Sequence, residues 1–318
     1  MRDALKQPLI LALVAMALLI AAGIPHGDAR TAAAAGSIPP AGDVLQPLIT
    51  TSELVVGPNR LAFGLLKDDT LVEDAEVRVR VYDIRDRQAQ LQAEMTAPYE
   101  RLEVVEQGNR VHIHPDGARH VHPEQTDVRG VYVTQVAFAR AGTWGLEVLA
   151  KRPNGLVAVS RFAVEVRQTP QTPAIGSPAP KSRNLIVSDV GDVRQIDTSD
   201  PPDAQLHQVR IADAIAQGRP QVVVFATPKF CTSRLCGPMV DIVRTLVPAY
   251  GDRVVFTHQE IWQDASAQQL FATVEEWNLP SEPWIFVVDG KGIVRAKFEG
   301  LATARELEAA LKPLLERE

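Results

Sequence analysis

Two cysteines are the residues whose type and spacing most directly suggest chemistry in this chain. Cys231 and Cys236 stand in "FATPKFCTSRLCGPM", directly after a short apolar run, and the 318-residue sequence contains no other cysteine. Two thiols this close in sequence can form a static disulfide, exchange disulfides with another protein or bind a soft metal ion. The pair is therefore the first candidate site.

The spacing of the pair restricts the structure around it. In an unbroken helix, positions i and i+5 point about 140° apart, which keeps their sulfur atoms too far apart to bond. The segment 231–237 must then be a loop or an unwound first turn, and Gly237-Pro238 favours a loop with Pro238 as the first helical residue. A structural staple is the alternative, although closing so short a loop contributes only about 2 kcal/mol.

The N-terminal residues indicate the compartment. Arg2 and Lys6 precede an apolar run at residues 8–24, which predicts a signal peptide or membrane anchor over residues 1–30 and a flexible linker over 31–45. The rest of the chain is then extracytoplasmic, secreted or membrane-anchored, where disulfides persist. The net charge is −6 and the lysines and arginines are scattered, so nucleic acid is not an expected partner.

Residues 46–168 read as strands. Alternating or β-branched segments are separated by turn signals such as "PNGL", and no convincing amphipathic helix interrupts them. This pattern predicts an all-β, immunoglobulin-like sandwich. The Pro-rich residues 169–182 that follow predict a stiff, extended linker. The predicted strands are "NRLAFGLL", "AEVRVRVYDI", "GVYVTQVAFA", "TWGLEVLAK" and "LVAVSRFAVEVR".

Residues 183–318 alternate buried strands with amphipathic helices. Strands are predicted at 221–226 and 253–258, with helices at 238–250 and 264–277 between and after them. The segment "WIFVVDGKGIVRAKFEG" predicts a hairpin that turns at Asp289-Gly290. Thr303 and Glu306 then form a capping box for the last helix. The predicted order is strand, helix, strand, helix, strand, strand, helix.

Residues 183–318 resemble the thioredoxin-like fold, and most closely the membrane-anchored thiol-disulfide oxidoreductases of bacterial cytochrome maturation, and four features carry the likeness. They are "IGSPAP" at 175–180, "VVVFATPKFC" at 222–231, "LPSEPWIFVVDGKGIV" at 279–294 and the strand, strand, helix ending. The resemblance implies an α/β thioredoxin-like C-terminal domain after the sandwich and the N-terminal hydrophobic segment.

The resemblance also implies roles for individual residues. Cys231 would sit where a strand ends and a helix begins, a position that favours its thiolate, and Cys236 would resolve the mixed disulfide. Pro283 would follow a cis peptide bond, lie against the cysteines and receive the substrate backbone. Phe230 would shield the thiol. His258 and Glu260, at the same sheet edge, are either proton carriers or ordinary solvated loop residues.

This chain departs from the family in its Cys-x4-Cys spacing, since the family carries Cys-x-x-Cys. A second alignment matches "CGPM" to the family's "CGPC", which would make Cys236 the nucleophile. Cys-x4-Cys also resembles one class of atypical peroxiredoxins, but these need a threonine where this chain has Pro228, with Thr227 one residue too early. We prefer Cys231 as the nucleophile because its distance from the strand fits better.

Four of the seven histidines lie in "VHIHPDGARHVHPE". If the segment forms a hairpin with His114 opposite His120, then His112 lies opposite His122, and all four imidazoles share one face. Such a face could bind copper or zinc. The alternative is a solvated polar hairpin. Copper chaperones of cytochrome oxidase assembly resemble the thioredoxin half, although they carry Cys-x-x-x-Cys.

The sequence thus predicts an extracytoplasmic thiol-disulfide oxidoreductase with Cys231, Cys236 and Pro283 as its site. Its partners would be protein thiols and disulfides outside the cytoplasm, together with the membrane through the N-terminal segment. No cofactor is required for the exchange. The alternatives are copper handling or protein interaction through the histidine hairpin, with copper or zinc bound there, and an atypical peroxiredoxin.

Overall fold

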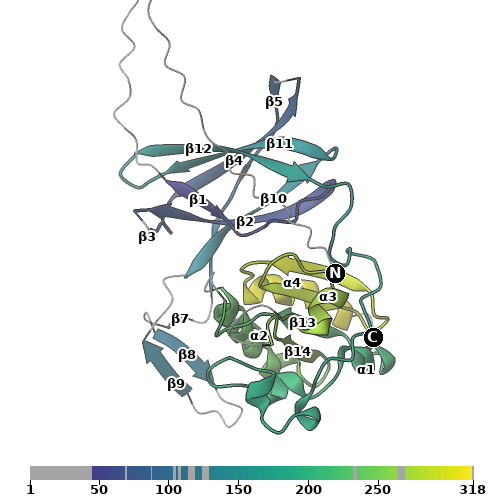
Figure 1. The fold of residues 1–318 in the computed structure, drawn as a ribbon. Helices are drawn as coiled ribbons and strands as arrows, with labels where there is room; N and C mark the ends of the chain where they lie inside the picture. The colour runs from purple at the N-terminus through teal and green to yellow at the C-terminus, as the bar shows by residue number, and fades with distance from the viewer. Residues whose placement is uncertain are drawn as a thin grey trace, which may run out of the picture. The chain divides into compact units, whose positions relative to one another are not determined.

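The computed structural model describes residues 45–316 apart from 69, 87, 103–104, 107–108, 114–118, 124–128, 232–234 and 264–268, and between 105 and 123 it describes the backbone alone. The fold is mostly β, with a sandwich-like first half and few helices (Figure 1). Residues Ala41–Glu318 form one compact unit. The predicted signal or anchor segment lies outside the described residues. Within those residues, no helix is long and apolar enough to cross a membrane.

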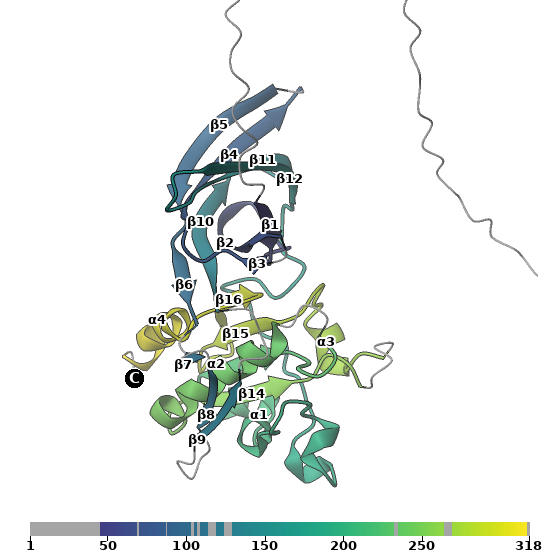
Figure 2. The same cartoon turned by 90° about the vertical axis from the view of Figure 1, so that its left-hand side faces the viewer.

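Two antiparallel sheets make up the sandwich (Figure 2). The first has the order β1-β2-β10-β6, with β3 paired to β2, and the second has the order β12-β11-β4-β5. The strands of the first sheet are β1 (Gln46–Ile49), β2 (Gly57–Lys67), β3 (Thr70–Leu71), β6 (Tyr99–Arg101) and β10 (Gly130–Phe138). Those of the second sheet are β4 (Glu76–Arg85), β5 (Gln88–Thr96), β11 (Gly142–Lys151) and β12 (Val157–Val166).

Alternation of side chains builds the sandwich core. Successive residues of a strand face opposite sides, so every second residue of β2, β4 and β11 enters a shared apolar cluster. The buried members include Phe63 from β2, Val79 from β4 and Trp144 from β11. The five strands predicted from the sequence are all present. A small separate sheet, β7 (Val105–Glu106), β8 (Asn109–Ile113) and β9 (Arg119–Pro123), follows β6 in the chain.

The second half is built on a four-stranded sheet of order β14-β13-β15-β16. Strand β13 (Gln221–Phe225) runs parallel to β14 (Val255–Gln259) and antiparallel to β15 (Trp284–Val288), which pairs with β16 (Val294–Glu299). The helices are α1 (Ile211–Ala216), α2 (Cys236–Tyr250), α3 (Ala272–Glu276) and α4 (Ala304–Leu315). From β13 onward, this element order is the order predicted from the sequence.

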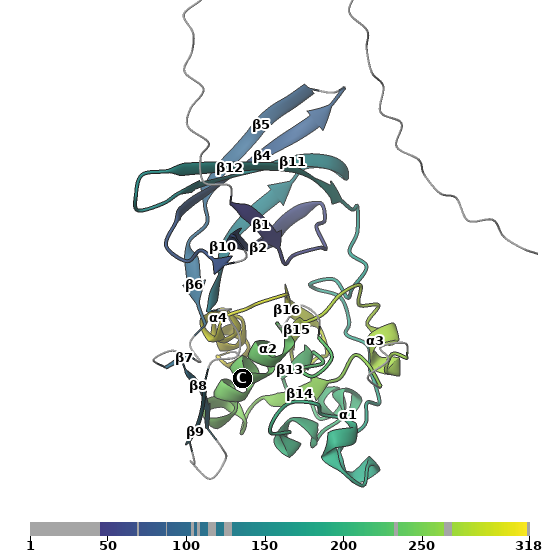
Figure 3. The ribbon, with the colours of Figure 1, turned by 60° about the vertical axis from the view of Figure 1, so that its left-hand side comes forward.

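Helices cover both faces of this sheet, which explains why its central strands are continuously apolar (Figure 3). Val222 and Val224 of β13 pack into one cluster with α2 and α4. Val223 and Phe225 of the same strand pack into a second cluster, with residues of α1 and α3. The sheet is therefore held from both sides, and the end of β13 is a rigid position for a functional group.

Two helix boundaries differ from the prediction. Helix α2 ends at Tyr250, with Gly251 as its C-cap, as expected, but it begins at Cys236 rather than Pro238. Proline is accepted at its third position because amides of a first turn have no intrahelical partner. Helix α3 spans Ala272–Glu276, so the predicted continuous helix over 264–277 is wrong. Residues 269–271 instead pair with 261–263, through the bonds Gln263 N to Gln269 O and Phe271 N to Ile261 O.

The capping box of α4 is confirmed. Thr303 Oγ1 accepts a hydrogen bond from Glu306 N at 3.2 Å, and Glu306 Oε2 accepts one from Thr303 N at 3.0 Å. Burial alone would raise the pKa of Glu306, but the Arg60 guanidinium and these bonds outweigh it and lower the pKa. Arg60 reaches across from β2, with its Nε 2.7 Å from Glu306 Oε1.

Replacing the cap gives a first prediction. Thr303→Ala removes the acceptor for the Glu306 amide, so we expect the free energy of unfolding to fall by about 1 kcal/mol. Urea denaturation followed by circular dichroism measures this. Thr245→Ala, an exposed threonine inside α2, is the matched control and should change stability by less than about 0.5 kcal/mol. Equal losses in the two variants would contradict a specific role for the cap.

The predicted linker 169–182 is not extended throughout, because it turns at 174–177, where Ser177 N donates to Ala174 O at 3.0 Å. It is also bound to the second half. Ala179 N donates to Gly292 O at 2.8 Å and Val294 N donates to Ser177 O at 3.0 Å, next to an isolated bridge between Pro178 and Ile293. The chain then continues through three short 3-10 turns, η1 (Val187–Asp189), η2 (Val193–Gln195) and η3 (Ala204–His207). This irregular stretch lies between the linker and α1, and part of it lines the candidate site.

Candidate functional site

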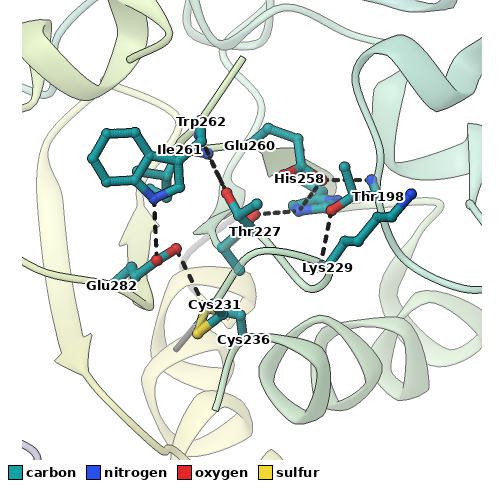
Figure 4. Close-up of a disulfide and its surroundings, with 11 residues drawn as sticks. Thr198, Thr227, Lys229, Cys231, Cys236, His258, Glu260, Ile261, Trp262 and Glu282 are labelled. Carbon is teal, nitrogen blue, oxygen red and sulfur yellow. Dashed lines mark hydrogen bonds and ion pairs between the residues drawn. A yellow bond between two sulfur atoms is a disulfide. The ribbon is translucent and has the colours of Figure 1, made fainter. Parts of the chain in front are cut away.

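The two cysteines form a disulfide at the carboxyl end of β13 (Figure 4). Their Cα atoms are 6.1 Å apart. Cys231 follows a turn in which its amide donates to Thr227 O at 3.0 Å. Cys236 is the first residue of α2. The pair therefore does not share one unbroken helix, as the spacing argument required.

The structure corrects the expected position of Cys231. We expected this residue at the start of the helix, but α2 begins five residues later, at Cys236. The positive end of the helix dipole therefore lies at Cys236. The physical reason is that the turn at 228–230 bends the chain after β13, and α2 starts only once Leu235 takes the helical backbone conformation of its N-cap.

The two sulfur-bearing residues differ in burial. Cys236 is fully buried in the cluster beneath α2, whereas Cys231 is half-buried. Cys231 also lines an open cavity of about 790 Å³, together with Phe230, Trp262 and Lys229. Phe230 and Cys231 thus line the same cavity, and the shielding of the thiol by Phe230 stays a prediction. A molecule entering this cavity reaches the sulfur of Cys231 before that of Cys236.

A carboxylate contacts the buried sulfur. Glu282 Oε2 lies 3.4 Å from Cys236 Sγ, and Glu282 Oε1 accepts a hydrogen bond from Trp262 Nε1 at 3.3 Å (Figure 4). Burial raises the pKa of Glu282 above its ordinary value, and the Trp262 and Thr227 hydrogen bonds offset this only in part. A carboxyl group whose pKa is raised by burial thus sits against the sulfur of Cys236.

The residue after Glu282 is Pro283, and the peptide bond between them is cis, as predicted. Pro283 is buried, and its carbonyl accepts a hydrogen bond from Gly300 N at 3.0 Å. The cis-peptide loop and the disulfide are thus adjacent through the contact of Glu282 with Cys236. The proposed role of Pro283 in receiving the substrate backbone stays a prediction.

His258 and Glu260 are not solvated loop residues. Their side chains are 0% and 2% exposed, because His258 belongs to β14, which is buried along its whole length. His258 Nε2 lies 2.9 Å from Ala226 O, and Glu260 Oε1 accepts a hydrogen bond from Thr198 N at 2.6 Å. Burial raises the pKa of Glu260.

Asp197 stands beside His258 and carries the local negative charge. Burial alone would raise its pKa, but His258, His207 and Ser199 outweigh this and lower it well below its ordinary value. Burial by itself would lower the pKa of His258; the neighbouring Asp197 carboxylate prevails and raises it. His207, in contrast, has its pKa lowered by burial.

The predicted histidine square has the wrong register. Strands β8 and β9 pair His112 with His120 and Arg110 with His122, with Val111 opposite Val121. The assumed pairs, His114 with His120 and His112 with His122, are therefore wrong by two residues. The hairpin closes at Ile113 and Arg119, one residue earlier on each strand than assumed. His114 lies outside the described residues, and metal binding by this hairpin stays a prediction.

Sequence reasoning missed three groups of the site. Glu282 was not singled out, although its position before Pro283, whose cis peptide bond was predicted, is the signal that could have identified it. Trp262 gave no signal, because it lies in an irregular segment. Asp197 and His207 also escaped, since residues 185–210 carry no periodic pattern that places them.

No described protein family matches the chain, and no curated protein matches it significantly. Three solved structures with low similarity are CopC from Methylosinus trichosporium OB3b, the PmoD soluble domain from Methylocystis sp. ATCC 49242 (Rockwell), and murine CRIg. CopC is 8% identical over 39% of this chain and 95% of its own, with a TM-score of 0.21. PmoD is 12% identical over 39% and 91%, with a TM-score of 0.21. CRIg is 13% identical over 40% and 97%, with a TM-score of 0.19. Similarities of this size assign neither a family nor a function.

Proposed function

We propose that residues 183–318 form a thioredoxin-like domain that exchanges disulfides with a protein partner. The observation that carries this proposal is the disulfide at the end of β13, with one sulfur open to a cavity and the other buried against a carboxylate. A staple needs neither feature. The order β14-β13-β15-β16, with α2 and α4 on one face and α1 and α3 on the other, supports the same fold.

Cys231 is the attacking residue in the reducing direction. Its thiolate attacks one sulfur of the partner's disulfide; a bond forms between the two sulfurs, and the partner's other sulfur leaves as a thiolate. The result is a mixed disulfide at the cavity. The half-buried position of Cys231 permits this approach, and the full burial of Cys236 prevents a competing attack by that residue.

Cys236 completes the reaction with Glu282 as its base. The Cys236 thiol gives its proton to Glu282 and attacks the sulfur of Cys231, and the second partner sulfur leaves as a thiolate. The partner gains two electrons and becomes a dithiol, while Cys231 and Cys236 lose two electrons and become the disulfide. The distance of 3.4 Å between Glu282 Oε2 and Cys236 Sγ suits a hydrogen bond from a thiol, because sulfur is larger than oxygen or nitrogen, and such contacts shorten in the reacting complex.

An extracytoplasmic location fits this function. The apolar run at residues 8–24 predicts export or anchoring, and a pair that must cycle through a disulfide needs an oxidising or controlled compartment. The partners would be exported proteins that carry thiols or disulfides. We propose that the sandwich presents or docks these partners.

The redox potential of the pair tests the proposal. The full chain is equilibrated in glutathione buffers of graded potential and its thiols are trapped by alkylation. We expect reversible oxidation with a midpoint between about −120 and −270 mV, the range of exchange proteins. A midpoint below about −300 mV is that of an inert structural disulfide and would reject the proposal.

Copper handling is the second candidate, and one observation favours it. The Cys231, Cys236 and Glu282 ligand atoms all lie within 4.8 Å of one another. Once reduced, two thiolates are soft ligands that select Cu(I). The candidates separate cleanly: a copper site would bind one Cu(I) in the reduced protein without reducing any protein disulfide, whereas an exchange protein reduces insulin in the absence of copper.

A further inference from the structure

A second group of metal-ligand residues lies behind the disulfide, in the protein interior. Asp197 follows the short turn η2, His207 ends η3, and His258 belongs to β14. Their side chains are 0% to 1% exposed. One ligand atom from each residue lies within 4.8 Å of the other two. Three separate segments of the chain thus converge on one buried point.

One atom in this group has no hydrogen-bond partner. The Ala226 carbonyl, 2.9 Å from His258 Nε2, can only accept a hydrogen bond, so the proton of the neutral ring belongs on Nε2. His258 Nδ1 then presents a lone pair toward Asp197 Oδ1, 3.5 Å away. Nδ1 is buried and makes no hydrogen bond. With a neutral ring, two buried acceptors face each other, which is costly unless a proton or a metal cation lies between them. A metal ion bound here would take the place of the proton that otherwise makes His258 cationic beside Asp197.

The separations suit a metal ion. His207 Nε2 is 3.2 Å from Asp197 Oδ2 and His258 Nδ1 is 3.5 Å from Asp197 Oδ1. Each histidine nitrogen faces a different oxygen of the carboxylate, at a separation close to the roughly 3.3 to 3.6 Å between two tetrahedral ligands on bonds of about 2.0 to 2.2 Å. One ligand atom from each of the three residues lies within 4.8 Å of the other two. Two imidazoles and one carboxylate are also a ligand set that Zn²⁺ and Cu²⁺ accept.

The carboxylate is held in place by the backbone. Ser199 N donates to Asp197 Oδ1 at 2.9 Å, and Asp203 N donates to Asp197 Oδ2 at 2.8 Å. Such partners fix the orientation of a ligand and raise its affinity for metal. The Arg244 guanidinium is more distant, with Nη2 3.9 Å from Asp197 Oδ2.

Two cavities adjoin the group. His207 and His258 line one of about 290 Å³. Asp197 lines the larger cavity of about 790 Å³, which Cys231 also lines, and Glu260 lines both the smaller and the larger cavity. We propose that Asp197, His207 and His258 form a divalent transition-metal site of the Zn²⁺ or Cu²⁺ class, separate from the cysteines and from the histidine hairpin.

Zn²⁺ titration of the oxidised full chain tests the site. The intact disulfide excludes the cysteines as ligands. The imidazoles of the histidine hairpin are removed by working in a background variant that carries His112→Ala, His114→Ala, His120→Ala and His122→Ala. We expect one equivalent of Zn²⁺ by calorimetry, and visible ligand-field bands of a four-coordinate site when Co²⁺ replaces it. In this background, His207→Gln should weaken binding at least about 100-fold, since changes to groups that merely support a ligand already cost 10- to 100-fold.

X-ray absorption at the zinc edge gives a readout that requires no change in the buried residues. The loaded background protein should show nitrogen and oxygen neighbours at about 2.0 Å, with imidazole scattering and without sulfur at about 2.3 Å. Absence of saturable binding, undiminished binding in a folded His207→Gln protein, or sulfur in the metal shell would each overturn the proposal. If His207→Gln does not fold, the absorption spectrum alone decides.

Discussion

Replacing Cys231 by serine should abolish disulfide exchange, while replacing Cys236 should trap the reaction halfway. A hydroxyl cannot supply the thiolate that attacks the partner's sulfur, and loss of a nucleophile costs roughly a thousandfold or more in rate. Cys236→Ser keeps the half-buried Cys231 at the cavity but removes the residue that resolves the mixed disulfide. We therefore expect a stable covalent complex with a model partner, visible on non-reducing gels.

The two serine variants control for each other. Both lose the same disulfide, and by the loop-closure formula both lose about 2 kcal/mol of stability, so a difference between them in trapping reports chemistry rather than folding. Trapping by Cys231→Ser and not by Cys236→Ser would make Cys236 the nucleophile, as the "CGPM" alignment implied. If the wild-type protein reduces no disulfide and neither variant forms a complex, the exchange mechanism is wrong.

The sequence predicted the sheet of the second half well because its central strands are buried on both faces. A continuous apolar run such as "QVVVF" is stable only under two layers of helices, and β13 is buried at every position. The same logic located α2, whose inward residues recur at helical spacing. The five predicted sandwich strands could be identified equally well, because apolar and polar residues alternate in a strand that has one buried face.

Strand β5 shows where this reasoning stops. Its sequence, "QAQLQAEMT", does alternate, with Ala89, Leu91, Ala93 and Met95 at every second position, and yet the strand was not among those predicted. Its first five residues are all exposed, Leu91 included, so the alternation marks no buried face there, and the strand is held through backbone pairing with β4. The start of α3 failed for a related reason: residues 269–271 pair with 261–263 through the backbone.

The candidate site was predictable only where a regular element positions it. Cys231 and Cys236 follow β13, and Pro283 directly precedes β15, and the sequence pattern predicted both strands. Asp197 and His207 reach the site from an irregular stretch that is ordered by hydrogen bonds, such as Ser199 N to Asp197 Oδ1 at 2.9 Å. The histidine hairpin failed on register, because its closure by one residue earlier on each strand changed every cross-strand pair.

Glu282→Gln should slow the resolving step and remove its sensitivity to acid. The carboxylate is the form that accepts the Cys236 proton, and burial raises its pKa above the ordinary value. As the pH falls through that raised pKa, the base is protonated and the wild-type rate of resolution should fall. Glutamine accepts no proton at any of these pH values, so the variant should be slower above the pKa by about 100-fold, the lower range of general-base catalysis, and should lack the acid limb.

Stopped-flow decay of a preformed mixed disulfide, followed from about pH 4 to 8, isolates this step from the initial attack by Cys231. Glu275→Gln is the matched control, because it makes the same change at an exposed position in α3 and should leave both rate and pH profile unaltered. Glu282→Asp should recover part of the rate if proton transfer is the function, since it restores a base at a longer distance. A Glu282→Gln protein that keeps the wild-type acid limb would show that another group takes the proton from Cys236, and the 3.4 Å contact would then be structural.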